Sequence, residues 1–185
     1  DKLPEVEEVI FDKTGVLTFG NPKIIASQVL IENRHWLEAA IVALEREMHH
    51  PLAEAFKAAF TPRLEPTSVT DVIVRAGLGV EGVVDGKWVV ITGPKGLDFY
   101  DLNPGEAGLA HAARMRLGPE ASSVMVFVGR TLAAIYAFED ALRPEVPEML
   151  RNLGRRGLYR TLLSGDTAIS VAKISQNLSL DTIRD

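Results

Sequence analysis

The chain has 185 residues, of which 46% are hydrophobic and 24% are charged, a composition typical of a globular protein with room for one large or two small domains. Its formal net charge of -5 argues against a broad nucleic-acid interface, so any phosphate site must be built locally from a few Lys, Arg and backbone N–H groups. The lack of cysteine excludes disulfides and thiolate metal sites within this sequence.

The first predicted element is a short strand from Glu8 to Phe11 that ends at Asp12. Residues 13–15 are predicted to turn, and the Gly-Asn-Pro sequence within residues 18–23 predicts a linker, because these residues interrupt regular structure. A carboxylate at the carboxyl end of a parallel strand faces the crevice in which open α/β sheets bind ligands. Asp12 is therefore the first candidate for a reactive group.

The middle of the chain predicts an α+β block. Asn33 is a suitable N-cap for a helix that runs to about Met48, and Pro51 suits the first turn of a second helix. From residue 67 the apolar period becomes that of strands, and Asp-Gly is the favoured pair for a type I′ hairpin turn. The predicted elements are the second helix to about residue 60, strands at 69–74, 83–84, 87–92, 124–128 and 132–138, the hairpin turn at 85–86, and a helix at 106–117.

The end of the chain returns to an α/β pattern, with a helix, a strand, a polar turn and a helix predicted over 145–155, 159–163, 164–166 and 167–177. A strand followed by a polar turn thus occurs at both ends of the chain, around the α+β block. The expected organisation is one α/β domain interrupted by an inserted domain, with the α/β domain over residues 1–22 and 135–185 and the insert over residues 23–134.

Asp12 can do more than accept hydrogen bonds. A carboxylate can attack a phosphoryl group and form an acyl phosphate, which divides one difficult transfer into two easier steps. Lys13 and the N–H groups of the turn can offset charge on the phosphoryl oxygens. The structural alternative is a strand that simply ends in an Asx-type turn.

The longer string around this residue is specific. Ile10-Phe11-Asp12-Lys13-Thr14-Gly15-Val16-Leu17-Thr18 resembles the phosphorylation signature of P-type cation-transporting ATPases, Asp-Lys-Thr-Gly-Thr-Leu-Thr, with Val16 in place of a Thr. The resemblance implies that Asp12 is the nucleophile that accepts the γ-phosphoryl group of ATP, with Lys13 and Thr14 beside it. It also implies that the main-chain carbonyl of Asp12 or Thr14 helps to hold Mg²⁺.

Two further strings resemble elements of the same family. Ser164-Gly165-Asp166 resembles its Thr-Gly-Asp, and the resemblance implies that Ser164 binds a phosphoryl oxygen through its hydroxyl, with Asp166 in the same catalytic turn. Asp140-Ala141-Leu142-Arg143-Pro144 resembles an element whose Asp and Arg lie near the nucleotide. The alternatives are an ordinary turn for Ser164 to Asp166, and a capping carboxylate with a local salt bridge for Asp140 and Arg143.

The middle block indicates a subgroup. Residues 45–53, Glu-Arg-Glu-Met-His-His-Pro-Leu-Ala, resemble the Ser-Glu-His-Pro-Leu element of heavy-metal-transporting P-type ATPases. The resemblance implies that His50 contacts adenine and that Glu45 is its acidic partner. Alternatively, His49 and His50 end a helix, where a protonated imidazole suits the dipole.

The string Gly77-Leu78-Gly79-Val80-Glu81-Gly82 links two predicted strands. It does not follow a first strand and open a helix, so a Rossmann dinucleotide site is not expected. The resemblance implies that this loop passes close to ATP through Gly77, Gly79 and Gly82, and the alternative is a flexible β-turn. Pro94 stands where the family often has Asn, and it offers neither an amide side chain nor an N–H.

The resemblance implies a haloacid dehalogenase-like (Rossmann-like) α/β phosphorylation domain, with an inserted α+β nucleotide-binding domain built on an antiparallel sheet. We expect the phosphorylation domain to be incomplete at its C-terminus, because the family's downstream Lys and Gly-Asp-Gly-x-Asn-Asp segment does not occur before Asp185. The expected function is the ATP- and Mg²⁺-dependent part of a transporter that couples ATP hydrolysis, through an aspartyl-phosphate, to heavy-metal movement, with copper(I) as the commonest ion.

The expected partners are ATP and the remainder of the same transporter, namely its membrane helices and actuator domain, with no nucleic acid. No apolar run approaches the roughly 18 residues that span a bilayer, so we expect a soluble segment at the cytoplasmic face of a membrane. One alternative is a fragment that binds nucleotide without turnover. Another is a soluble haloacid dehalogenase-type phosphatase, against which Thr14 argues, since a second Asp normally occupies that position.

Overall fold

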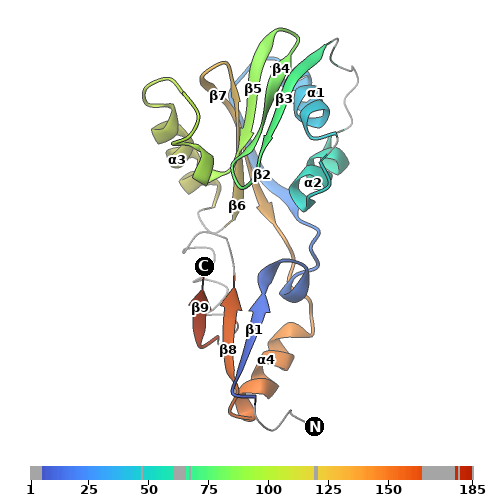
Figure 1. Ribbon diagram of the computed structural model, residues 1–185, viewed down its shortest axis with the longest axis vertical. Helices are drawn as coiled ribbons and strands as arrows, with labels where there is room; N and C mark the ends of the chain where they lie inside the picture. Colours follow the sequence, from blue (N-terminus) through green and yellow to red (C-terminus); the bar gives the residue numbers. More distant parts are fainter. Residues whose placement is uncertain are drawn as a thin grey trace. The chain divides into compact units, whose positions relative to one another are not determined.

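The structure is a computed structural model that describes residues 6–46, 48–60, 66, 68–118, 121–163, 178 and 180–184. It divides the chain into two compact units (Figure 1), the terminal unit with residues 1–22 and 140–185 and the insert unit with residues 23–139. The first division falls at the residue that the sequence indicates. The second falls after Glu139 rather than after residue 134, because strand β7 (Thr131–Glu139) belongs throughout its length to the sheet of the insert unit.

The insert unit is built on a six-stranded antiparallel sheet in the order β2-β7-β6-β5-β4-β3. Both residues of the β4–β5 turn have positive φ, 48° at Asp85 and 75° at Gly86, which confirms the predicted type I′ chemistry. The edge strand β2 was not predicted from the sequence. The strands besides β7 are β2 (Lys23–Val29), β3 (Val69–Arg75), β4 (Gly79–Val84), β5 (Lys87–Thr92) and β6 (Ser122–Val128).

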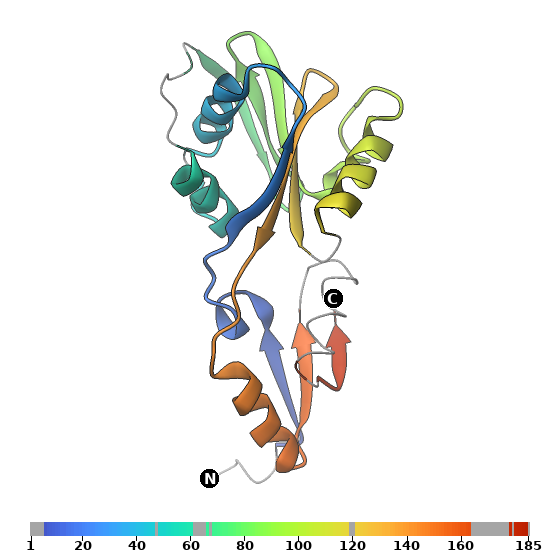
Figure 2. The same cartoon turned by 180° about the vertical axis from the view of Figure 1, so that it is seen from behind.

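Helices cover both faces of this sheet (Figures 1 and 2). α1 (Arg34–Leu44) and α2 (Pro51–Ala59) bury Ile41 and Phe56 against one face, and α3 (Glu106–Leu117) buries Ala110 against the other. Because both faces are covered, the central strands β6 and β7 are buried almost from end to end, and they read as continuous apolar runs rather than as alternating ones.

The helices begin where the sequence predicts. Asn33 caps α1, because its side chain accepts a hydrogen bond of 3.1 Å from the Trp36 N–H. α1 ends at Leu44 rather than near Met48, and α2 begins at Pro51. Within the described parts of the chain, the helices lack the combination of length and apolar character needed to cross a bilayer.

Among its described residues, the terminal unit has three parallel strands in the order β1-β8-β9. They are β1 (Glu8–Asp12), β8 (Tyr159–Leu163) and β9 (Thr182–Arg184), the last of which was not predicted. α4 (Val146–Arg155) packs on one face of this sheet, where its residues Val146 and Leu150 share a core with Phe11 of β1 and Leu162 of β8. The predicted helix over residues 167–177 lies outside the described residues.

Candidate functional site

Asp12 ends β1, and its side chain is exposed. Its partner in the parallel ladder is Leu163, the last residue of β8. β1 stops here because the chain turns through Gly15, whose φ of 78° lies in the left-handed region that glycine adopts without strain. The two strands therefore present an exposed carboxylate at their carboxyl edge, where open α/β sheets bind ligands.

Lys13 follows Asp12 but is buried, with 8% of its surface exposed. Burial lowers the pKa of Lys13, and the carboxylate of Asp140 opposes this shift by raising it. The signature thus places a negative side chain in solvent and the adjacent positive side chain inside the unit, while Thr14 is exposed.

Thr18 closes the turn Lys13–Leu17 and is 1% exposed. Its N–H donates to the Lys13 carbonyl at 3.1 Å, and its hydroxyl accepts from the Gly15 N–H at 3.2 Å. That hydroxyl also lies 3.1 Å from the Lys13 carbonyl oxygen and 2.6 Å from Asp140 Oδ2. Thr18 was part of the recognised string, but sequence reasoning gave it no role.

Asp140 and Arg143, predicted to lie near the nucleotide, both contact this turn. Asp140 accepts from Thr18 and from the N–H groups of Gly20 and Asn21, at 3.0 and 3.1 Å. Arg143 Nε donates to the Thr18 carbonyl at 3.0 Å, and Nη2 donates to the Gly15 carbonyl at 3.3 Å. The structure therefore brings Asp140 and Arg143 into contact with the string that begins at Asp12 and ends at Thr18.

Ser164 and Asp166, the remaining predicted catalytic residues, lie outside the described residues. Leu163 is opposite Asp12 in the ladder, so the chain leaves β8 at the same edge of the sheet as the carboxylate.

His50 and Glu45 are paired in the insert unit. The Nε2 atom of His50 lies 3.2 Å from Glu45 Oε2, an oxygen that is fully buried and makes no hydrogen bond of good geometry with the described residues. The other ring nitrogen, Nδ1, accepts from the Ala53 N–H at 3.1 Å and caps α2. The Glu45 carboxylate raises the pKa of His50. The alternative in which His49 and His50 end a helix is wrong for His50, since it is the N-cap of α2.

The three glycines of the Gly-x-Gly-x-x-Gly string differ in environment. Gly77, with φ of 74°, lies in the turn before β4, and a Cβ there would meet open space. Gly79 and Gly82 belong to β4 itself, which corrects the prediction of a loop. A Cβ on Gly79, whose φ is 142°, would collide with the Ile91 carbonyl oxygen, and one on Gly82 would press on the side chain of Leu44. Packing therefore accounts for the second and third glycines.

Pro94 begins a short 3-10 turn, Pro94–Gly96, a position that suits a fixed φ. This turn follows β5 and adjoins the glycine string, because the Thr92 hydroxyl donates to the Leu78 carbonyl at 2.7 Å. The Pro that replaces the expected Asn is thus half-buried next to the β3–β4 turn, and the neighbouring Lys95 is exposed.

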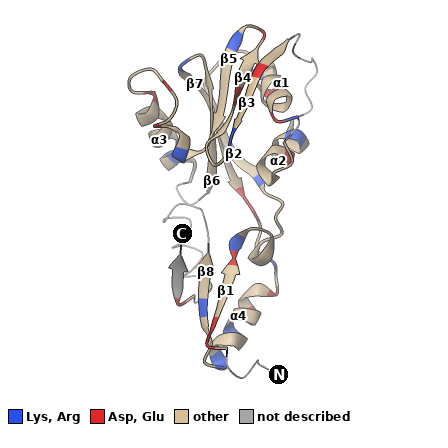
Figure 3. Ribbon diagram, in the orientation of Figure 1, with Lys and Arg blue, Asp and Glu red and all other residues tan. Residues whose placement is uncertain are grey.

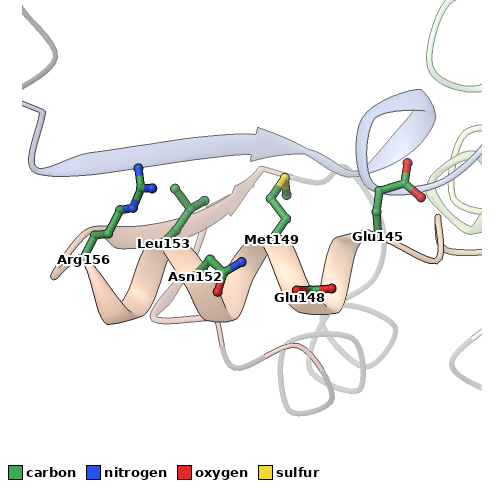
Figure 4. Close-up of a pocket in the computed structure, with 6 residues that line it drawn as sticks. All are labelled: Glu145, Glu148, Met149, Asn152, Leu153 and Arg156. Carbon is green, nitrogen blue, oxygen red and sulfur yellow. The ribbon is translucent and has the colours of Figure 1, made fainter.

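Charge and cavities elsewhere do not outline another site. Lys and Arg are interspersed with Asp and Glu along both units (Figure 3), and the described part of the chain has no group of three or more His, Cys, Asp or Glu that could hold a metal ion. A pocket along α4 has Met149 and Leu153 pointing toward β1 (Figure 4), and its lining is Glu145, Glu148, Met149, Asn152, Leu153 and Arg156. All six belong to α4 or to its two cap positions, Glu145 and Arg156, and none is a predicted site residue.

Comparison with known proteins decides the family. A sequence profile described as haloacid dehalogenase-like hydrolase matches residues 7–185. The chain belongs to this family. Its fold is accordingly a haloacid dehalogenase-like α/β fold, here with a second unit built on an antiparallel sheet.

The curated relatives are metal-transporting ATPases. The chain is 31% identical over 98% of its length to the probable copper-transporting ATPase SynA of Synechococcus elongatus, covering 22% of that protein. It is 27% identical over its full length to the zinc-exporting P-type ATPase of Mycobacterium marinum, covering 26% of that protein. The chain is therefore homologous to the catalytic region of heavy-metal P-type ATPases and spans about a quarter or less of their length.

Solved structures show the same fold. The catalytic domain of the CPx-ATPase CopB-B, from a study of nucleotide binding, superposes with a TM-score of 0.69 at 22% identity, over 99% of this chain and 64% of that one. The N-domain of HMA6, a copper-transporting P-type ATPase, superposes with a TM-score of 0.51 at 20% identity, over 64% of this chain and 99% of that one. A fold like that of the N-domain can thus exist as a separate structure.

Proposed function

We propose that this chain is the ATP-binding and phosphorylation region of a P-type ATPase that moves a heavy-metal cation across a membrane. Its partners are then ATP and the rest of the same transporter, and the segment works at the cytoplasmic face. The observation that carries the proposal is the exposed carboxylate of Asp12 at the carboxyl edge of two parallel strands, next to a buried lysine. Copper and zinc are the ions named for the two relatives described above.

The proposed reaction is phosphoryl transfer to Asp12. A carboxylate oxygen of Asp12 attacks the γ-phosphorus of ATP, an Asp–O–P bond forms, and the bond to the β–γ bridging oxygen breaks, so that ADP leaves with the electron pair. Water later attacks the phosphorus, which releases inorganic phosphate and restores the carboxylate. Lys13 and the N–H groups of the turn offset charge on the phosphoryl oxygens, which is the main catalytic demand of this chemistry.

The donor set at this edge suits Mg²⁺. Asp12 and Thr14 are both exposed, and their main-chain carbonyls supply the hard oxygen ligands that Mg²⁺ prefers, while the ion usually keeps several waters and takes few protein ligands. When bound, Mg²⁺ neutralises charge on the phosphates. We assign the main-chain carbonyl of Asp12 or Thr14 to this role.

The adenine of ATP is proposed to stack on the ring of His50. Both ring nitrogens face protein groups, Nδ1 toward the Ala53 N–H and Nε2 toward Glu45, while 44% of the side chain is exposed. A ring whose nitrogens are engaged offers its face rather than a hydrogen bond. Glu45 is buried, so its role is to orient His50, and Gly77 in the open turn before β4 allows close approach of the phosphates.

The test is covalent labelling. The chain, and in parallel the intact transporter that contains it, is incubated with γ-labelled ATP and Mg²⁺, and the acid-stable label is then treated with hydroxylamine, which cleaves acyl phosphates. We expect label that hydroxylamine removes, and none in the Asp12→Asn variant. Because Asp12 is exposed, the free energy of unfolding of that variant should differ from the wild-type value by at most about 0.5 kcal/mol.

The outcomes separate the alternatives. Label that persists in Asp12→Asn would overturn the assignment of the nucleophile. ATP binding without label in the isolated chain, but with label in the intact transporter, would indicate a nucleotide-binding fragment. Hydrolysis of simple phosphate monoesters by the isolated chain, with no dependence on ATP, would instead indicate a soluble phosphatase.

A further inference from the structure

Asp140 lies where the chain returns to the terminal unit after the insert unit. Its carboxylate accepts three hydrogen bonds from residues 18–21, the segment through which the chain leaves the terminal unit. They come from the Thr18 hydroxyl at 2.6 Å and from the N–H groups of Gly20 and Asn21. Asp140 thus begins the return segment of the chain, and its carboxylate accepts hydrogen bonds from the outgoing segment.

Arg143 makes a second set of contacts, to residues 15–19. Its guanidinium donates to the carbonyls of Thr18 and Gly15 and lies 5.2 Å from the centre of the Phe19 ring, and its N–H donates to the Leu17 carbonyl at 2.9 Å. A planar guanidinium that holds two carbonyls fixes their relative orientation. Arg143 thus stabilises the turn by donating hydrogen bonds to its main-chain carbonyls.

The contacts lead to the nucleophile through Thr18. A hydroxyl has one proton, and the short contact of 2.6 Å to a charged acceptor assigns that proton to Asp140. The lone pairs of Thr18 then remain for the Gly15 N–H, while its main-chain N–H holds the Lys13 carbonyl. Lys13 is adjacent to Asp12 in the chain. Asp140 is therefore connected to the reacting carboxylate through its hydrogen bond with Thr18, the hydrogen bond from Thr18 to Lys13 and the peptide bond between Lys13 and Asp12.

We propose that Asp140 and Arg143 are positioning residues, which hold the Lys13–Leu17 turn in the shape that exposes Asp12 and buries Lys13, and which are needed whenever Asp12 reacts. The inference rests on the proposed function, in which Asp12 is the phosphorylated group. It differs from the role implied by resemblance, in which both residues contact the nucleotide. Both carboxylate oxygens of Asp140 accept hydrogen bonds from residues 18–21, the segment that directly follows the turn, which supports the positioning role.

The two roles differ when no nucleotide is present. Hydrolysis of the aspartyl-phosphate is reversible in principle, so inorganic phosphate can label Asp12 directly. In that reaction an Asp12 oxygen attacks phosphorus and an Asp–O–P bond forms, while the bond from phosphorus to a phosphate hydroxyl breaks and that hydroxyl takes a proton and leaves as water. A residue that only contacts the nucleotide has no part in this reaction, whereas a residue that shapes the turn does.

The experiment compares labelling of the intact transporter by γ-labelled ATP and by labelled inorganic phosphate, with Mg²⁺. We expect Asp140→Asn to lower both initial rates by about tenfold or more, since a lost charge-assisted hydrogen bond corresponds to about that factor. Nucleotide affinity at equilibrium should stay within about twofold of the wild type. Glu139→Gln is the matched control, because Glu139 is the adjacent exposed carboxylate, and it should label normally.

A second pair of variants keeps the test decisive if Asp140→Asn fails to fold. Thr18→Ser retains the hydroxyl and should keep most of the labelling from both donors, whereas Thr18→Val removes it and should lose both. Combining Thr18→Val with Asp140→Asn should lower the rate no further than the worse single variant. Labelling by phosphate that stays at the wild-type level in Asp140→Asn, or in Thr18→Val, would overturn the inference. A wild type without label at Asp12 would instead overturn the proposed function.

Discussion

Both ring nitrogens of His50 face protein groups, and this favours one tautomer of the neutral ring. An Nδ1 atom that accepts from the Ala53 N–H carries no proton, so the neutral ring has its proton on Nε2, facing Glu45. Glu45 raises the pKa of His50, whereas the cap at Nδ1 opposes a second proton. His50 is therefore a capping residue of α2, and under the proposed function its ring face is also the surface that binds adenine.

The first prediction concerns this pair. Glu45→Gln should lower the pKa of His50, measured from its imidazole proton shifts by NMR. Because the native pKa is raised, the stabilisation from Glu45 is fully present below the unfolded pKa of about 6.5 and is lost as pH rises through the native pKa. The gap in unfolding free energy between the wild type and Glu45→Gln should therefore narrow as the solution is made alkaline. A gap that widens would contradict the pairing.

The second prediction concerns the cap. His50→Ala should destabilise the insert unit by about 0.5–2 kcal/mol, as loss of an N-cap does, and His50→Asn should restore most of that stability, since Asn is a good cap. Neither variant presents a ring to adenine, so both should weaken ATP binding. Urea unfolding and ATP titration of the same two proteins separate the capping role from the binding role. Equal free energies of unfolding for His50→Ala and His50→Asn would contradict the capping role of His50.

At this scale the sequence was informative where the chemistry is local. Asp12, Lys13 and Thr14 were found because they are adjacent in one string. The contact between Thr18 and Asp140 joins residues 122 positions apart, and no local pattern indicates it. Likewise, the capping role of His50 was missed because His is an uncommon cap and Pro51 alone signalled the start of the helix.

At the scale of elements, β4 shows how packing can override propensity. Glycine is disfavoured in strands, so the sequence predicted a loop over residues that form β4. The third prediction follows from the crowding at Gly79. Gly79→Ala should cost several times more unfolding free energy than Gly77→Ala, for which about 1–2 kcal/mol of left-handed strain is expected. Urea unfolding measures both, and equal costs would contradict the crowding at β4.

Elements with complete local signals were predicted well. The Asp85-Gly86 hairpin, α2 and α3 each carry their own turn, cap or period. β2 and β9 were missed for a different reason. β2 follows a Gly-Asn-Pro break and is fixed by pairing with β7 over 100 residues away in the sequence, and β9 has three residues, which is too short for a period to be visible.

At the scale of the whole molecule, the units have separate cores. The cores of the insert unit contain residues such as Phe56 and Phe127, and that of the terminal unit contains Phe11 and Leu150. A core that shares no members with its neighbour can melt independently. Which unit binds ATP is therefore a question that thermal unfolding can answer.

The fourth prediction follows. ATP should raise the melting temperature of the transition that belongs to the insert unit, by the equivalent of about 2.7 kcal/mol at a concentration 100 times its Kd, and leave the other transition in place. Asp12→Asn should keep this shift, because Asp12 lies in the terminal unit, and His50→Ala should reduce it. Calorimetry of the three proteins checks this. If ATP raised only the melting temperature of the terminal unit, the proposal that the insert unit binds ATP would be excluded.

Lys23 and Glu139 are partners in the β2–β7 ladder, so the first and last residues of the insert unit lie about 5 Å apart, as in any antiparallel pair. On the other side of the junction, the Asn21 N–H reaches Asp140 at 3.1 Å. A stretch of chain that starts and finishes at one spot can be added to a host fold, or removed from it, with little loop-closure entropy. A circular permutant of the insert unit, with residues 23 and 139 joined by a short hairpin turn, should therefore fold by itself.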